Sequence, residues 1–257
     1  MNGVAKQLWW LTGFSAAMMA AGLVWAGFET RLLQDALVWI KPFKFALSFV
    51  VFFATLAWAV GRLSPLVASR RGLRWLVVIL TAAFWFEMIY ITAQAAQGLG
   101  SHYNTGDLYH GVMYGLMGVG AVSLVLGTAV IGWAVLRDTG AVLHPDLRFG
   151  VGVGFILSTG LTLVTAATLS AMPSHFVGMP PAGAATIPFL GWSAAVGDLR
   201  PAHFIALHAM QAIPLLAWLV AGTARARAWI IGGSVAYSAL TMALYVQALM
   251  GLPLLRL

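Results

Sequence analysis

The stretch WLVVILTAAFWFEMIYITAQAAQ, residues 75–97, contains a single charged residue, Glu87. As an α-helix rising about 1.5 Å per residue, it is long enough to cross about 30 Å of hydrocarbon. Scanning the rest of the chain for such apolar runs gives seven candidate spans in all. They lie at 8–28, 43–61, 75–97, 110–136, 148–171, 202–222 and 228–250. The sequence therefore predicts an all-α polytopic membrane protein, with residues 1–257 as one seven-helix domain.

The composition supports this class. Of the 257 residues, 61% are hydrophobic and 8% are charged, whereas a soluble domain carries about 25% charged residues. The short alternating segments of a membrane barrel are absent. The first span has only Lys6 before it and lacks a clear cleavage site, so we expect a retained helix rather than a signal peptide. The absence of cysteine excludes disulfides and thiol catalysis.

The distribution of arginine predicts the orientation. Positive residues accumulate in cytoplasmic loops, and here they cluster in alternate loops, at Arg62, Arg70, Arg71, Arg74, Arg137, Arg148, Arg225 and Arg227. We therefore expect the amino terminus in the cytoplasm and the carboxyl terminus outside, in a prokaryotic inner (plasma) membrane. The first outer loop is mixed in charge, with Glu29, Arg31, Asp35 and Lys41. The basic residues of these loops account for the net charge of +7. The expected partner is therefore the lipid bilayer, and no nucleic-acid partner is expected.

The outer half of the predicted bundle holds most of the histidines. His144 is the one histidine on the cytoplasmic side, and the other five are His102, His110, His175, His203 and His208. The longest outer loop, residues 172–201, is rich in glycine, proline and aromatic residues. Such a loop is expected to fold onto the membrane or over the bundle. It is a candidate lid, with an ordinary interfacial loop as the alternative.

Span three contains a polar stripe. Its members are Glu87 and, counted from it, Tyr90 at +3, Gln94 at +7 and Gln97 at +10. This spacing places them on one narrow face of a helix. Glu87 lies about 15 Å from the outer end of the span. An ionisable group at that depth is costly unless it is protonated, paired or hydrated, and is by default a functional candidate. The alternative is a protonated glutamate that bonds a neighbouring helix.

Span six opens with DLRPAHFIALHAMQ, residues 198–211. Asp198 is expected to cap this helix and Arg200 to anchor it at the headgroups. His208 lies about 12 Å from the outer end, at a depth similar to that of Glu87, and Gln211 follows on nearly the same face. His203 is about 140° away around the helix, so the two histidines do not share one narrow stripe. The alternative is that His203 is interfacial and only His208 points inward.

Span seven carries a further polar stripe, for which helix packing competes with a binding site; its members are Ser234, Tyr237, Ser238, Thr241 and Tyr245. Several familiar sites are excluded. Span seven has no lysine for a retinal Schiff base, and the chain contains neither HExxH nor HxxxH. No phosphate loop is present.

The leading functional hypothesis is a metal or haem centre for redox chemistry near the outer leaflet. Neutral histidine is a natural ligand of haem iron, copper and zinc. The ligands would be His110, His203 and His208, and the cofactor haem b or a transition metal. Gln94 and Gln211 would lie beside it, and Glu87, His208 and Asp107 are the candidates for acid–base work or a proton path.

Three other functions remain open. A proton-coupled small-molecule transporter would use Glu87 and His208, which we expect to share one polar pocket. A metal-dependent hydrolase would act on a small apolar or lipid-like ligand with zinc-activated water. An accessory subunit would use the cluster to stabilise a larger membrane complex.

The predicted orientation can be tested directly because the chain has no cysteine. Single cysteines introduced as Ser69→Cys and Ala184→Cys should react with a membrane-impermeant maleimide from opposite sides. In intact cells we expect labelling at position 184 and none at position 69. Labelling of Ser69→Cys in intact cells would reverse the orientation.

Overall fold

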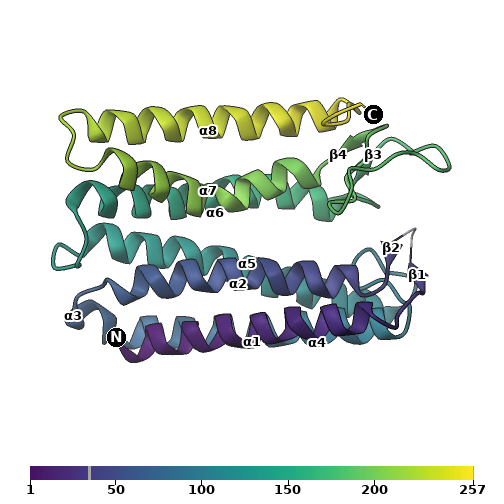
Figure 1. The fold of residues 1–257 in the computed structure, drawn as a ribbon, viewed down its shortest axis with the longest axis horizontal. Coiled ribbons are helices and arrows are strands. Elements are labelled where there is room, and N and C mark those ends of the chain that lie inside the picture. The colour runs from purple at the N-terminus through teal and green to yellow at the C-terminus, as the bar shows by residue number, and fades with distance from the viewer. Residues whose placement is uncertain (34–35, 257) are drawn as a thin grey trace. The chain divides into compact units, whose positions relative to one another are not determined.

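The computed structural model describes residues 1–33 and 36–256, so that Asp35 of the first outer loop lies outside the described residues. Within this part, seven helices are long and apolar enough to cross a membrane (Figure 1), which confirms the seven predicted spans. They are α1 (Gly3–Ala26), α2 (Ile40–Gly61), α4 (Arg71–Ala96), α5 (Leu108–Arg137), α6 (Pro145–Ala171), α7 (Arg200–Val220) and α8 (Ala226–Leu249). The ends of these helices are named below by the predicted orientation.

Each helix begins two to five residues before the apolar run that predicted it, and proline lies in the first turn of α2, α6 and α7. The Asn2 side chain accepts a hydrogen bond from the Ala5 amide and caps α1. The side chain of His144 caps α6 in the same way through Asp146, and Pro145 follows as the first helical residue. One short helix, α3 (Pro65–Ala68), was not anticipated; it precedes α4 and is capped by Ser64.

The chain forms two compact units. The first contains Met1–Gly127 with Asp138–Val142, and the second contains Thr128–Arg137 with Leu143–Leu257. The long helix α5 begins in the first unit and ends in the second. Each unit is described by itself below, and the single domain expected from the sequence stays a prediction.

The two units have the same order of elements. In the first, α1 is followed by the hairpin of β1 (Leu32–Leu33) and β2 (Ala36–Leu37), then by α2 and α4. In the second, α6 is followed by the hairpin of β3 (Phe176–Val177) and β4 (Gly197–Asp198), then by α7 and α8. Figure 1 shows each hairpin at the end of the long helices of its own unit. Each unit thus has a long helix, a pair of short antiparallel strands and two further long helices in that order. The units also differ, because residues 178–196 separate the two strands of the second unit, and the first unit contains α3 and the start of α5 as well.

The helices that follow the hairpins also begin alike. Residues 40–45 read IKPFKF, and residues 199–204 read LRPAHF. In both, a basic residue precedes a proline that is buried in the first turn, Pro42 in α2 and Pro201 in α7. The two helices therefore share a basic residue and a buried proline at the same place in their first turns.

Close helix packing in the second unit depends on two glycines of α6. A Cβ atom at Gly150 would lie 2.2 Å from the Cβ of Ala217, and one at Gly154 would lie 2.7 Å from Cδ of Pro214. Small residues at such positions allow transmembrane helices to approach closely. The Ser158 hydroxyl, one turn further along α6, lies 2.8 Å from the carbonyl oxygen of Leu207 and fastens α6 to α7.

Candidate functional site

The stripe of span three faces the interior of the first unit over most of its length. Glu87, Tyr90 and Gln94 are buried, with exposed fractions of 4%, 5% and 4%. Gln97 is exposed, and its Nε2 donates to the carbonyl of Ala93 in its own helix. The buried polar surface therefore runs from Glu87 to Gln94.

Glu87 lies against a glycine of α5. A Cβ atom at Gly120 would be 3.1 Å from Oε1 of Glu87. The glycine therefore leaves space for the carboxyl group, which a larger residue would crowd. In the described part of the chain this Oε1 has no hydrogen-bond partner, and the same holds for the Tyr90 hydroxyl and Gln94 Oε1. Buried polar atoms normally have partners, and an isolated buried carboxylate is costly. Three unsatisfied atoms on one face therefore mark a place suited to a bound molecule or water.

Lys41 is a cation whose charge acts on the buried stripe of α4. The sequence did not predict this relation. Lys41 was expected in the mixed outer loop, but α2 begins at Ile40 and so includes Lys41 in its first turn. Its charge acts on Glu87, and its Nζ lies 3.2 Å from Nδ1 of His102. Pro42 could have revealed this placement, because proline is favoured in the first turn of a helix.

His102 accepts a hydrogen bond from Lys41 in a largely apolar setting. Its Nδ1 also lies 3.1 Å from the Ser101 hydroxyl, and its ring packs near Phe45 and Tyr114, with centroids 5.7 and 6.0 Å away. Burial, with the positive charge of Lys41 as the second cause, lowers the pKa of His102 to about 3. The ring is therefore neutral at physiological pH. With Nδ1 as the acceptor, the remaining ring proton is on Nε2.

His110 lies at the start of α5 and pairs with Asp107. Its Nδ1 is 2.6 Å from Oδ2 of Asp107, while Oδ1 accepts from the His110 amide. Asp107 thus caps the helix and orients the ring together. The bonds from the His110 amide and ring lower the pKa of the Asp107 carboxyl. The ring donates to this carboxylate through Nδ1, which leaves Nε2 with its lone pair.

Each of the two histidines of α7 also has a hydrogen-bond partner at Nδ1, within the second unit. His203 Nδ1 lies 3.1 Å from the Thr165 hydroxyl, and that hydroxyl donates to a carbonyl of its own helix, so it accepts from the ring. His208 Nδ1 lies 3.2 Å from Oε1 of Gln211, on the shared face that the spacing predicted. Phe204 packs against the His208 ring, with centroids 4.2 Å apart. In both histidines the lone pair is again on Nε2.

The polar stripe of α8 mainly packs helices together. The Tyr237 hydroxyl donates to the carbonyl of Ile205 in α7 at 2.7 Å, and Tyr245 bonds Thr168 of α6. The hydroxyls of Ser234, Ser238 and Thr241 donate to carbonyls of their own helix. These contacts favour the packing interpretation over a binding site.

Arg200 has a partner within the protein, and its expected role as a headgroup anchor stays a prediction. Its guanidinium forms an ion pair with the buried Asp198, with 2.6 Å between Nη2 and Oδ2, and also donates to the carbonyl of Gly191. Asp198 accepts from the Arg200 amide as the predicted cap, and from the amide of Ser193. This pair fastens residues 172–201 to the start of α7. The role of that loop as a lid stays a prediction.

The candidate residues divide between the two units. Glu87, Gln94, Asp107 and His110 belong to the first unit, and His203, His208 and Gln211 belong to the second. In the described residues no three side chains of histidine, aspartate, glutamate or cysteine are grouped to hold a metal ion. The pocket shared by Glu87 and His208 would join the two units and stays a prediction.

Comparison with protein-family models, with curated proteins and with solved structures finds no match. Function is therefore argued from the residues themselves.

The low pKa of His102 predicts acid sensitivity. The unfolded ring takes up a proton near pH 6.5, and the folded ring only near pH 3. The unfolded state therefore binds more protons in this window, and the free energy of unfolding should fall as the pH decreases from about 6.5 towards 3. In His102→Gln, the thermal midpoint in detergent should fall less between pH 7 and pH 5.

Tyr114→Phe is the matched control, because it keeps a ring against His102 and changes no charge near it. It should retain the wild-type pH dependence. Equal slopes for wild type and His102→Gln would show that His102 is not held neutral by its surroundings.

Proposed function

We propose that this seven-helix membrane protein is a proton-coupled carrier of a small molecule, with Glu87 as the proton-binding group. The observation that carries the proposal is the setting of Glu87. It is buried at membrane depth, its Oε1 has no partner among the described residues, and it lies against Gly120. Ionisable groups in such positions commonly belong to proton relays and transport pathways.

The surroundings of Glu87 allow it to exist in two charge states. In general, removal from water disfavours a charged carboxyl and a cation nearby favours one, so that a buried carboxyl in a cluster containing a cation can gain and lose a proton. Lys41 is itself held by the neutral ring of His102. Protonation of Glu87 would therefore change the net charge of this polar cluster by one, while Lys41 keeps its hydrogen bond. A coupling group requires this ability to gain and lose a proton without losing the fold.

The similar order of elements in the two units supports transport over a simple structural role. Many transporters are built from two internal repeats. In each unit of this chain a long helix, a pair of two-residue strands and two further long helices follow in that order. The unsatisfied atoms of Tyr90 and Gln94 on the same face as Glu87 would be available to a polar solute.

The proposal is tested in two steps with Glu87→Gln and the exposed-site control Gln97→Ala. Infrared difference spectra between acid and neutral pH should contain the C=O band of a titrating carboxylic acid in wild type and in the control, and lack it in Glu87→Gln. The protein is then placed in liposomes with a trapped pH dye, and a panel of amino acids, sugars and organic acids is added one at a time. At least one solute should cause proton movement across the membrane. Glu87→Gln should reduce that proton movement at least tenfold.

The amide of Glu87→Gln preserves shape, so its thermal midpoint should stay close to that of wild type. Undiminished solute-driven proton movement in Glu87→Gln would contradict the assignment of the coupling group.

A metal or haem centre is the second candidate function, and one observation favours it. Each of the three predicted ligands is bonded at Nδ1, His110 to Asp107, His203 to Thr165 and His208 to Gln211. Histidines that bind metals are commonly oriented by such a bond to the other ring nitrogen. Haem b or a transition metal would supply redox chemistry there. Nε2 of these three histidines would be the ligating atom.

Cofactor occupancy separates this candidate from the first. If the three histidines hold one cofactor, His110→Ala, His203→Ala and His208→Ala should each lower bound haem or metal by a similar large factor, measured by absorption and elemental analysis. His144→Ala, on the opposite side of the membrane, should leave it unchanged. Equal occupancy in all four variants would remove this candidate. Stoichiometric zinc would favour the lipid hydrolase.

A further inference from the structure

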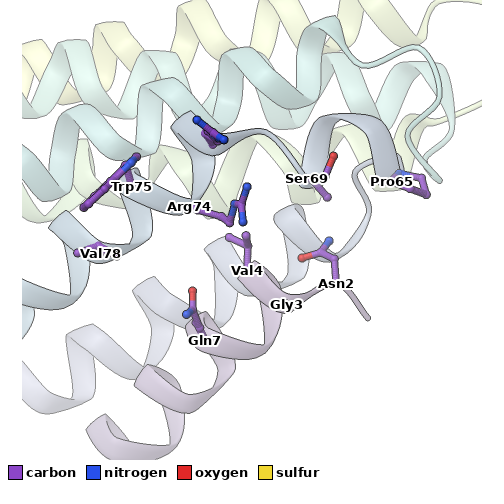
Figure 2. Close-up of a pocket in the computed structure, with 11 residues that line it drawn as sticks. Asn2, Gly3, Val4, Gln7, Pro65, Ser69, Arg74, Trp75 and Val78 are labelled. Atoms are coloured by element: carbon purple, nitrogen blue, oxygen red, sulfur yellow. The ribbon is translucent and has the colours of Figure 1, made fainter.

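The first unit has a pocket at its cytoplasmic end that the proposed function does not use. It has a volume of about 900 Å³ and lies between the start of α1, the short helix α3 and the start of α4. Figure 2 shows Val4 and Gln7 on the α1 side, Ser69 after α3, and Arg74 and Trp75 on α4. All of these residues belong to the first unit.

Two arginines give the pocket its charge. Arg71 and Arg74 both line it, and both are exposed. Among the described residues neither forms a salt bridge, whereas Arg31 and Arg200 pair with carboxylates close by in the sequence. Two guanidinium groups at one pocket match the oxygens of a phosphate group, which arginine can bind in a bidentate manner.

Part of the lining of the pocket is apolar. Trp75 and Val78 line it with exposed fractions of 67% and 50%, and both belong to α4, a helix long and apolar enough to span a membrane. Val4 forms a buried apolar part of the lining. An exposed tryptophan at the end of a span is typical of the level of the headgroups. A ligand at this site therefore meets both cationic and apolar side chains.

We propose that this pocket binds the headgroup of an anionic phospholipid, with its phosphate between Arg71 and Arg74 and its acyl chains along Trp75 and Val78. Basic pockets at the cytoplasmic ends of transmembrane helices commonly bind anionic lipids. Free phosphate has the anionic group that the arginines would bind, but it has no acyl chain to contact Trp75 and Val78. The lining by Trp75 and Val78 is the reason for assigning a lipid.

Native mass spectrometry of the full chain, released from detergent, measures this binding. The probes are phosphatidylglycerol, phosphatidylcholine with the same acyl chains, and inorganic phosphate. Wild type should bind phosphatidylglycerol more tightly than phosphatidylcholine. In Arg71→Gln/Arg74→Gln, phosphatidylglycerol binding should weaken about thirtyfold, which corresponds to about fivefold for each cationic side chain near an anionic surface.

The control Arg62→Gln/Arg225→Gln removes the same charge from the same predicted side of the membrane, at exposed positions that do not line the pocket. It should keep the preference for phosphatidylglycerol. Ser69→Trp fills the pocket and keeps both arginines, so it should also weaken lipid binding and provides a test if the arginine variant does not fold. Equal binding of both lipids, equal losses in the control, or arginine-dependent binding of inorganic phosphate without a preference for phosphatidylglycerol would overturn the proposal.

Discussion

The exclusion of water from the hydrocarbon core is the constraint on which the rest of this structure depends. A backbone amide or carbonyl in that region must bond within the protein, which requires helices. Polar side chains in the spans meet the same requirement locally. The hydroxyls of Ser15, Thr159 and Thr241 donate to carbonyls of their own helices, and those of Ser158 and Tyr237 donate to carbonyls of α7. Buried atoms without a partner among the described residues also occur on Trp39, Thr92 and Thr162, but those of Glu87, Tyr90 and Gln94 share one face of α4, and only Glu87 among the six residues is a carboxylic acid.

The sequence predicted what depends on composition and local spacing. The seven spans follow from hydropathy, and the burial of Glu87 together with Gln94 follows from helical periodicity. Contacts between distant parts of the chain were not predictable in this way. Lys41 and His102 are 61 residues apart, and no local pattern links them. The ion pair of Arg200 with Asp198 was also not predicted, because a basic residue at the end of a span can meet a headgroup or a carboxylate, and the sequence does not choose between them.

The similarity between the two units was not visible in the sequence for a related reason. An inverted repeat was not evident in seven spans, and the two units share few letters beyond the basic residue and proline that begin α2 and α7. What the two units share is the order of elements, with a hairpin between the first and second long helices. Such hairpins are only two residues long on each strand, and strands of that length leave no periodic signal.

The two units differ in the chemistry of corresponding positions. An exposed tryptophan begins the third long helix of each unit, Trp75 in α4 and Trp229 in α8. Twelve residues after each lies a buried polar residue, Glu87 in the first unit and Thr241 in the second. Thr241 satisfies its hydroxyl within its own helix, which a carboxyl at that depth does not do for both oxygens. At these two positions, the first unit has an ionisable side chain and the second has a hydroxyl. If the fold needed only a hydrogen-bonding side chain there, threonine would suffice in both units. A glutamate is more costly than threonine at this depth. Gly120 leaves room for it, and Lys41 acts on its charge. A function that involves proton exchange would explain why this position has a glutamate.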